Sequence, residues 1–152
     1  MRSVIQRVSE ASVEVDGATV ARIGPGLLAL VAVVPSDTEG DVAAMVTKIA
    51  NLRIFPDGDN LMNSSLVDHG GEVLVVSQFT LAASVRKGRR PSFSGAADPK
   101  MAEPMVEDVA VGLASLGIGV QTGVFGARMA VALVNDGPVT FVIDTVQGSV
   151  VD

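Results

Sequence analysis

The longest apolar run in this chain is Leu27 to Val34, eight residues without a polar side chain. Apolar residues at both odd and even positions are typical of a strand that is buried on both faces, at the centre of a sheet. The run is far shorter than the ~20 residues that a membrane-spanning helix needs. We therefore expect a sheet in which this segment is a central strand.

Other segments show the patterns of further strands. Ala11, Val13 and Val15 alternate with polar residues, which is the period-2 pattern of a strand with one buried face. Asp16-Gly17 then favours a tight hairpin turn. Four more strands are expected at 19–23, 73–79, 129–134 and 139–146, the last two joined by a turn at 135–138.

Two segments show helical periodicity instead. In the first, which Ser36, Asp37 or Thr38 can cap, an apolar stripe is formed by Val42, Met45, Val46 and Ile49. In the second, which Gly117 ends, one face carries Met105, Val109, Leu113 and Leu116. A helix that began at Asp98-Pro99 would contain Pro104, so we expect either a kink at Pro104 or a start near Glu103.

The length and composition suit one folded domain. The chain has 152 residues, of which 48% are apolar and 18% charged, and this excludes a disordered or fibrous protein. No repeat, linker or low-complexity tract divides it. We expect residues 1–152 to form a single α/β domain that is rich in antiparallel strand pairing.

Charge and residue usage narrow the range of partners. The net charge of −6 argues against a protein that binds nucleic acid along a broad basic face, and DNA is not expected as a partner. The chain has no cysteine, which excludes disulfides and thiol nucleophiles. The first residues lack the pattern of a signal peptide. We expect a cytoplasmic protein with no membrane partner.

One short segment runs against the acidic balance. Arg86-Lys87-Gly88-Arg89-Arg90 places four of the eleven basic residues within five positions. Such a cluster is either a solvated loop or a compact phosphate contact that touches only the end of an RNA.

Most of the usual catalytic and binding devices are missing from the sequence. His69 is the only histidine, and its place beside Gly70-Gly71 favours a surface loop over a general base. Asp57-Gly58-Asp59-Asn60 resembles the start of a calcium loop, but the later glycine and glutamate that such a loop requires are absent. No glycine-rich phosphate loop precedes a helix. We therefore expect no metal site and no cofactor.

Two polar segments are left as candidates for a functional site. Ser77, Gln78, Phe79 and Thr80 end an expected buried strand, where a site can form or where the polar groups simply cap the chain. Gly137-Pro138 lies within a strand-turn-strand segment, where a glycine-proline turn is common. From composition and spacing alone the function of the chain stays open.

These two segments carry a family resemblance. Ser-Gln-Phe-Thr-Leu at 77–81 and Asn-Asp-Gly-Pro-Val-Thr at 135–140 resemble the paired signatures of the D-aminoacyl-tRNA deacylases. The similarity runs through nearly the whole chain, and further matching segments are Ile5–Val8, Ala11–Val13, Arg53–Phe55, Arg90–Phe93 and Gln121–Gly123. The resemblance implies an α/β fold with a layered, barrel-like, largely antiparallel sheet and two main helices.

The resemblance also implies an activity and a site. The chain would form a homodimer and would need no metal. It would bind the aminoacylated 3′ end of D-aminoacyl-tRNA and hydrolyse its ester. Gly137-Pro138 would be a cis dipeptide that enters the partner's pocket, and Arg7 would hold it. The reacting ester would be lined by Ser77, Gln78, Phe79 and Thr80, with Thr80 as a candidate nucleophile. Phe125 and Met129 match family positions near the adenosine.

Two mechanistic hypotheses follow for such an enzyme. The ester is already activated and the terminal ribose carries a 2′-hydroxyl, so the protein need only orient the substrate and stabilise an oxyanion. Rejection of L-aminoacyl-tRNA would act at Cα through rigid main-chain carbonyls, and glycyl-tRNA, for example glycine mischarged on tRNA-Ala, would escape this filter. The alternatives are a non-catalytic acidic dimer that binds RNA ends or proteins, and a hydrolase of small D-amino-acid esters.

Overall fold

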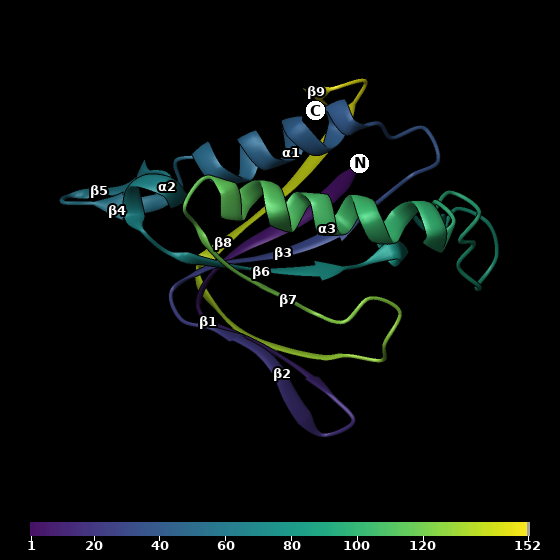
Figure 1. Ribbon diagram of the computed structural model, residues 1–152, viewed down its shortest axis with the longest axis horizontal. Helices are drawn as coiled ribbons and strands as arrows, with labels where there is room; N and C mark the ends of the chain where they lie inside the picture. The colour runs from purple at the N-terminus through teal and green to yellow at the C-terminus, as the bar shows by residue number, and fades with distance from the viewer. Residues whose placement is uncertain (152) are drawn as a thin grey trace.

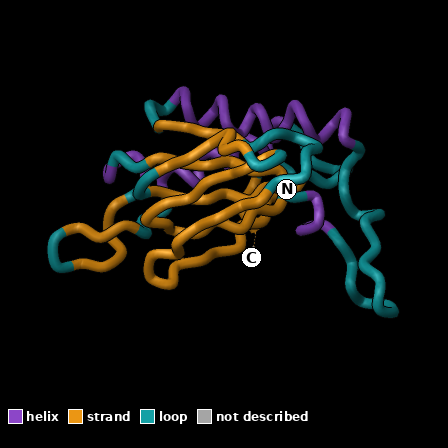
Figure 2. Tube along the Cα trace, turned by 90° about the horizontal axis from the view of Figure 1, so that it is seen from below, coloured by secondary structure: helices purple, strands orange, loops and turns teal. Residues whose placement is uncertain are grey.

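A computed structural model describes residues 1–151 and shows one curled sheet with helices packed across one face (Figure 1). The two long helices are α1 (Glu39–Asn51) and α3 (Pro99–Ser115), which lie against each other. Figure 2 shows the strands as one layer beneath them. No helix among the described residues is long and apolar enough to cross a membrane.

The sheet is mixed. Its strands follow the order β7 (Gly119–Thr122), β6 (Glu72–Ser77), β3 (Gly26–Ala32), β1 (Arg2–Val15), β8 (Ala130–Val146) and β9 (Ser149–Val151), and β2 (Ala18–Ile23) also pairs with β1. The pairs β3–β6 and β6–β7 are parallel, and the other pairs are antiparallel. The expected α/β class with largely antiparallel pairing is confirmed.

The apolar run at 27–34 forms the centre of the sheet, as its pattern predicted. Strand β3 lies between β1 and β6, and six of its seven residues are buried. One set of its side chains, including Leu27 and Val31, packs under the helices. The other face of the sheet curls into a half barrel, where Leu28 of β3 packs with Ile23 of β2 and Leu74 of β6. The curl explains why a central strand is apolar on both faces.

Both helices follow the predicted periodicity. Helix α1 begins after the N-cap Thr38 and buries the predicted stripe of Val42, Met45, Val46 and Ile49. Helix α3 begins at Pro99, and the carboxylate of Asp98 accepts a hydrogen bond of 2.9 Å from the Lys100 N–H. The alternative start near Glu103 is wrong, because this cap and a first-turn proline favour the earlier start. Pro104 therefore lies inside the helix.

The C-terminal strands correct a second expectation. The segments predicted at 129–134 and 139–146 are not two strands joined by a turn but belong to one strand, β8, that runs along β1. Val8 pairs with Asn135 and Gln6 pairs with Thr140, so four residues of β8 bulge out opposite a single residue of β1. The turn signal was real, but β1 is long enough to pair with the chain on both sides of the bulge.

Several short elements carried no clear sequence pattern. A small hairpin is formed by β4 (Phe55–Asp57) and β5 (Asn60–Ser64), and the one-turn helix α2 (Leu66–His69) follows it. A 3₁₀ turn, η1 (Phe79–Ala82), follows β6. In Figure 1 the hairpin lies at the left end of the molecule, and β6 runs away from it toward the side where η1 begins.

Candidate active site

The first signature segment lies where β6 ends. Side chains alternate along a strand, and Val73 and Val75 point toward the helices, so Ser77 lies on the same face. The N–H of Gln78 donates a 2.7 Å hydrogen bond to the carbonyl of Val31, after which the chain turns into η1. The sheet thus holds Ser77 at its edge, beneath helix α3.

An apolar cavity of about 370 Å³ opens at this strand end. Ser77 supplies its polar edge, and Phe79, Phe93 and Phe125 supply aromatic walls. The remaining lining comes from small and aliphatic residues, among them Val31, Ala97, Ala102 and Val106. A concave site that is mostly apolar with few polar groups is the usual form of a small-molecule pocket.

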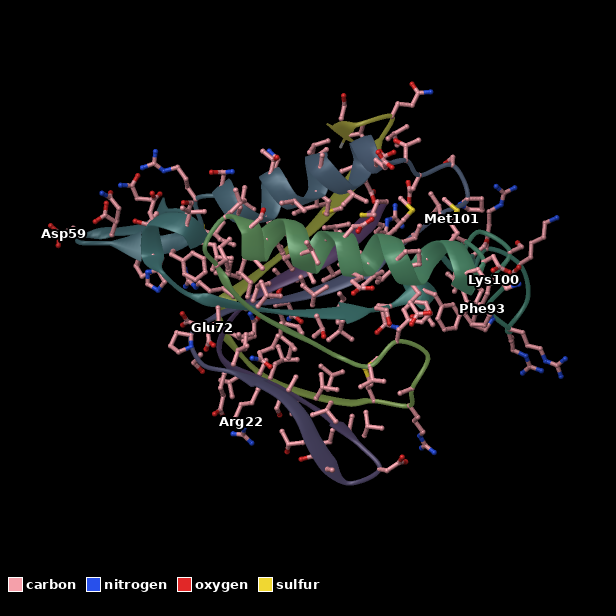
Figure 3. All side chains as sticks on the ribbon, in the orientation of Figure 1. Arg22, Asp59, Glu72, Phe93, Lys100 and Met101 are labelled. Carbon is pink, nitrogen blue, oxygen red and sulfur yellow. The ribbon has the colours of Figure 1, made fainter. Side chains whose placement is uncertain are left out.

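Two phenylalanines form the rim of this cavity. The rings of Phe79 and Phe93 meet edge to face, with centroids 5.1 Å apart. Their exposed fractions are 55% and 44%, which is high for aromatic side chains. Figure 3 labels Phe93 beside the N-terminal end of α3, next to Lys100. The rim offers an apolar surface at which a flat ring can stack.

Two backbone donors lie at the start of η1, the turn that carries the cavity residue Phe79. The first hydrogen bond of η1 runs from the Leu81 N–H to the Gln78 carbonyl, so the N–H groups of Phe79 and Thr80 precede it. Within residues 1–151 neither of these two groups has a hydrogen-bond acceptor. The side-chain amide of Gln78 donates to the hydroxyl of Thr80. Two adjacent free donors can bind an oxyanion.

A second groove of about 540 Å³ adjoins the first between α3 and β7. Ser77, Phe125 and Val106 line both, so these residues form the boundary between the two hollows. Glu103 and Glu107 of α3 line only the second groove, where they add negative charge.

The second signature segment is held from beneath by Arg7. Its guanidinium donates from Nη1 to the carbonyl of Ile54 at 2.6 Å and from Nε to the carbonyl of Asp136 at 3.2 Å. The carboxylate of Asp136 lies 3.1 Å from Nε. Arg7 is only 9% exposed, although it carries a charge. Its fork of donors ties β1, the segment before β4 and the bulge of β8 together.

Asn135 closes the bulge on itself. Its amide nitrogen donates to the carbonyl of Arg7 at 2.8 Å and to that of Val139 at 3.1 Å. The Gly137–Pro138 peptide bond is cis, and both residues are exposed. The bulge is therefore a fixed projection from the sheet surface.

The two signature segments do not meet within one chain. The bulge lies opposite Arg7, which pairs across the sheet with Leu27 of β3, and Leu27 pairs with Val73 of β6. Ser77 of β6 pairs with Val31, four residues further along β3. The bulge and Ser77 are three strand spacings apart across the sheet and four residues apart along it, which is about 20 Å at usual sheet dimensions. The projection and the cavity are therefore separate features of one chain.

The other predicted site residues divide between the two faces. Phe125 lines the cavity. Met129 instead packs on the opposite face of the sheet, in the core that contains Leu28 and Leu74, and its sulfur lies over Gly123. Phe93 and Asn135 were not singled out from the sequence as site residues, although both lie within segments that resemble the family. No pattern in the sequence marks Phe93 as a site residue. Its place at the cavity rim is evident only from the structure.

His69 and two carboxylates with lowered pKa belong to the scaffold. His69 stacks on Phe55 with ring centroids 4.5 Å apart, which accounts for the only histidine. No group of three metal-binding side chains occurs among the described residues. A hydrogen bond from the Ser65 hydroxyl lowers the pKa of Asp68 in the cap of α2, and a hydrogen bond from Arg2 lowers the pKa of Asp144.

Comparison with solved structures identifies the class of fold. A structure described as a probable eukaryotic D-amino acid tRNA deacylase matches 93% of this chain and 97% of its own, with a TM-score of 0.82 and 18% identity, which shows the fold alone. A structure described as c-Myc DNA Unwinding Element Binding Protein matches 95% of this chain and 99% of its own, with a TM-score of 0.89 and 38% identity. The protein thus has the deacylase class of α/β fold.

Sequence comparison identifies the family. The family described as D-Tyr-tRNA(Tyr) deacylase matches residues 4–144. The D-aminoacyl-tRNA deacylase of Dinoroseobacter shibae is 61% identical over 92% of this chain and 97% of its own, and that of Roseiflexus castenholzii is 59% identical over 95% and 92%. This chain belongs to the D-Tyr-tRNA(Tyr) deacylase family. The predicted resemblance and the predicted enzyme class are confirmed.

Proposed function

We propose that this protein hydrolyses the ester between a D-amino acid and the terminal adenosine of tRNA, as chiral proofreading for translation in the cytoplasm. Family membership carries the reaction type. The apolar cavity at the end of β6, with Ser77 at its edge, offers a place for an aminoacyl adenosine. The amino acid and the tRNA leave as separate products.

Oxyanion stabilisation supplies most of the catalysis in this proposal. Water adds to the ester carbonyl carbon, and the carbonyl oxygen becomes an oxyanion that accepts hydrogen bonds from the free N–H groups of Phe79 and Thr80. The bond from the carbon to the ribose oxygen then breaks, and that oxygen takes a proton. The neighbouring 2′-hydroxyl of the ribose relays protons, because no histidine lies at the cavity. Donors of this kind typically contribute about 10²–10³ in rate.

The Thr80 hydroxyl acts as a positioning group in this mechanism. It accepts a hydrogen bond from the Gln78 amide, and this contact orients the hydroxyl without removing its proton. A nucleophilic hydroxyl needs an adjacent base. Among residues 1–151, no carboxylate or imidazole is hydrogen-bonded to Thr80.

A homodimer supplies the chiral filter. Strand β9 pairs only with Asp144–Val146, so residues 130–143 of β8 leave one edge without a strand among the described residues. Exposed apolar side chains lie along this strand: Val134, Phe141 and Val142. An open strand edge with exposed apolar side chains favours pairing with a second copy. The partner's surface would then receive the Gly137-Pro138 projection.

Main-chain carbonyls of that projection would test the configuration at Cα. An L side chain would collide with them, whereas a D side chain would point away and the amino group would bond to them. Arg7 and Asn135 support the proposal because they fix the bulge from beneath. Glycine has no side chain at Cα, so glycyl-tRNA would also be cleaved.

Incubation with D-tyrosyl-tRNA and L-tyrosyl-tRNA tests the function. We expect the protein to release D-tyrosine from D-tyrosyl-tRNA. L-tyrosyl-tRNA should be hydrolysed only at its uncatalysed rate. An intact D ester would instead indicate a binding module for RNA ends or proteins. Equal rates on D-tyrosyl-tRNA and D-tyrosine ethyl ester would indicate a hydrolase of small esters. Sedimentation of the same sample tests the dimer.

A further inference from the structure

A basic loop projects from the molecule between η1 and α3. Ser84 and Ser92 exchange two backbone hydrogen bonds of 2.8 and 2.9 Å, which close residues 85–91 into a loop. Gly88 has a φ of +70°, a conformation that favours glycine, and allows the chain to reverse there. Figure 2 shows this segment standing away from the sheet. We call residues 84–92 the basic arm.

The positive charge of the basic arm is not compensated. Its four cations are Arg86, Lys87, Arg89 and Arg90, all of them exposed. Since the whole chain carries −6, the residues outside the arm carry −10. Within residues 1–151 no carboxylate forms a salt bridge with these four side chains, whereas Arg2 and Arg7 are paired. A free cationic loop on an acidic protein attracts anions to one place.

The arm begins and ends at the candidate active site. On one side, Ser84 follows η1 by two residues. On the other side, Phe93 comes directly after Ser92, and its ring forms the cavity rim with Phe79. A ligand whose reacting end lies in the cavity therefore has the arm beside its exit.

We propose that the basic arm binds the backbone phosphates of the tRNA 3′ end. This inference rests on the proposed function, because it places the aminoacyl adenosine in the cavity. Arginine presents a planar fork of donors that matches phosphate oxygens, and three of the four cations are arginines. Phosphate contacts carry no sequence information, so the arm binds acceptor ends of different tRNAs alike. The acidic remainder of the surface repels the rest of the tRNA.

The test compares two substrates and two double variants. The substrates are D-tyrosyl-tRNA and 3′-O-D-tyrosyl adenosine, which carries the same ester without any phosphate. The arm variant combines Arg86→Gln with Arg89→Gln. The control variant combines Arg22→Gln with Lys48→Gln, which removes the same charge from β2 and α1. Figure 3 labels Arg22 on the strand β2, which lies far from Phe93 in that view.

We expect the arm variant to raise KM for D-tyrosyl-tRNA about tenfold with kcat unchanged, and to leave hydrolysis of D-tyrosyl adenosine at the wild-type level. The dependence of log kcat/KM on log salt should become shallower by about 0.7 for each lost phosphate contact. The control variant should leave KM and kcat near the wild-type values for both substrates, apart from a small effect of the altered net charge.

The outcomes separate the two proposals. If the wild-type protein cleaves neither substrate, the proposed function fails. If it cleaves both and the arm variant behaves as the control on D-tyrosyl-tRNA, the function stands and the arm proposal is overturned. An equal loss on both substrates also overturns it, since the arm would then act on the cavity and not on phosphates.

Discussion

The Nε of Arg7 lies 3.2 Å from the main-chain oxygen of Asp136 and 3.1 Å from its carboxylate. The two residues are 129 positions apart in the chain. This contact fixes the base of the bulge that carries Gly137-Pro138, and the second arm of the guanidinium ties the same point to Ile54. The position of the projection therefore depends on this buried cation together with Asn135.

Substitution of Arg7 by lysine should reduce discrimination between the two enantiomers. A lysine ammonium is a single point charge and cannot reproduce the fork that reaches Ile54 and Asp136 together. We expect the ratio of kcat/KM for D-tyrosyl-tRNA over L-tyrosyl-tRNA to fall about tenfold or more, which corresponds to about 1.4 kcal/mol. Deacylation rates on both substrates measure it.

Arg2→Lys is the matched control for this variant. Arg2 lies on the same strand and binds the carboxylate of Asp144 on β8 with two hydrogen bonds of 2.8 and 2.9 Å. This pair is largely exposed, and such pairs contribute about 0–1 kcal/mol to stability. We expect the D-to-L ratio to stay at the wild-type value. An unchanged ratio in Arg7→Lys would show that Arg7 does not position the filter.

Thr80→Val should leave kcat within a few-fold of the wild-type value. Valine has nearly the same shape and keeps the backbone N–H, but it removes the hydroxyl. Because the proposed mechanism uses the N–H and not the hydroxyl, only the contact with Gln78 is lost. Single-turnover rates on D-tyrosyl-tRNA measure this effect. A fall in kcat of about 10⁴ with an unchanged circular dichroism spectrum would assign the hydroxyl as the nucleophile.

Removal of the Phe79 N–H tests the oxyanion site directly. Phe79→Pro deletes this donor at the first position of η1, where proline is tolerated, and Phe79→Ala deletes only the ring. We expect Phe79→Ala to act mainly on KM. Phe79→Pro should lower kcat by a further factor of about 10². Equal kcat values in the two variants would remove the Phe79 N–H from the mechanism.

Local patterns predicted the parts of the fold that depend on neighbours in sequence. The apolar run of β3 and the apolar stripe of α1 each indicate which residues of a single element are buried. The structure confirms both predictions. The strand predicted at 73–79 is β6, but it ends at Ser77, two residues earlier, because the chain turns into η1 there. The bulge of β8 was not predicted, because Asn135 to Pro138 has the pattern of a turn between two strands until the length of β1 is known.

In the candidate site, too, local sequence patterns indicated some residues, and contacts between distant segments determine the rest. The polar residues 77–80 stand together in sequence, and a pattern could single them out. The contact of Arg7 with Ile54 and Asp136 joins three distant segments, so nothing near Arg7 in the sequence distinguishes it from an exposed strand arginine. The Phe79–Phe93 rim depends in the same way on the closure of the basic arm.

Asp41 should make stability depend on pH in acid. Burial acts to raise the pKa of this carboxylate. Hydrogen bonds from the N–H groups of Gly148 and Thr38 and from the Thr38 hydroxyl outweigh burial, so the pKa lies below its usual value. A lowered pKa stabilises the folded state above the unfolded-state pKa of about 3.9. This contribution is lost as the pH falls through the lower, folded-state pKa.

Asp41→Asn measures that contribution. At pH 7 we expect the free energy of unfolding to fall by about 2 kcal/mol, because an amide nitrogen would face backbone donors. The difference from wild type should shrink below about pH 4, because the unfolded wild-type chain takes up a proton at Asp41 there while the folded carboxylate, with its lower pKa, stays ionised. Glu39→Gln, in the same helical turn but exposed, is the control. A difference that stays constant between pH 7 and pH 3 in urea unfolding would contradict the assigned cause.

Gly26→Ala should destabilise the sheet that carries Ser77. A Cβ at Gly26 would lie 1.9 Å from the main-chain oxygen of Glu72, so β3 and β6 would have to separate. At Gly24 the nearest atom would be the Glu72 carboxylate oxygen at 3.7 Å, an ordinary contact. We expect Gly26→Ala to cost about 3 kcal/mol and roughly 10 °C in Tm, and Gly24→Ala to stay within about 0.5 kcal/mol. Equal melting temperatures would mean that the two strands approach less closely than the structure shows.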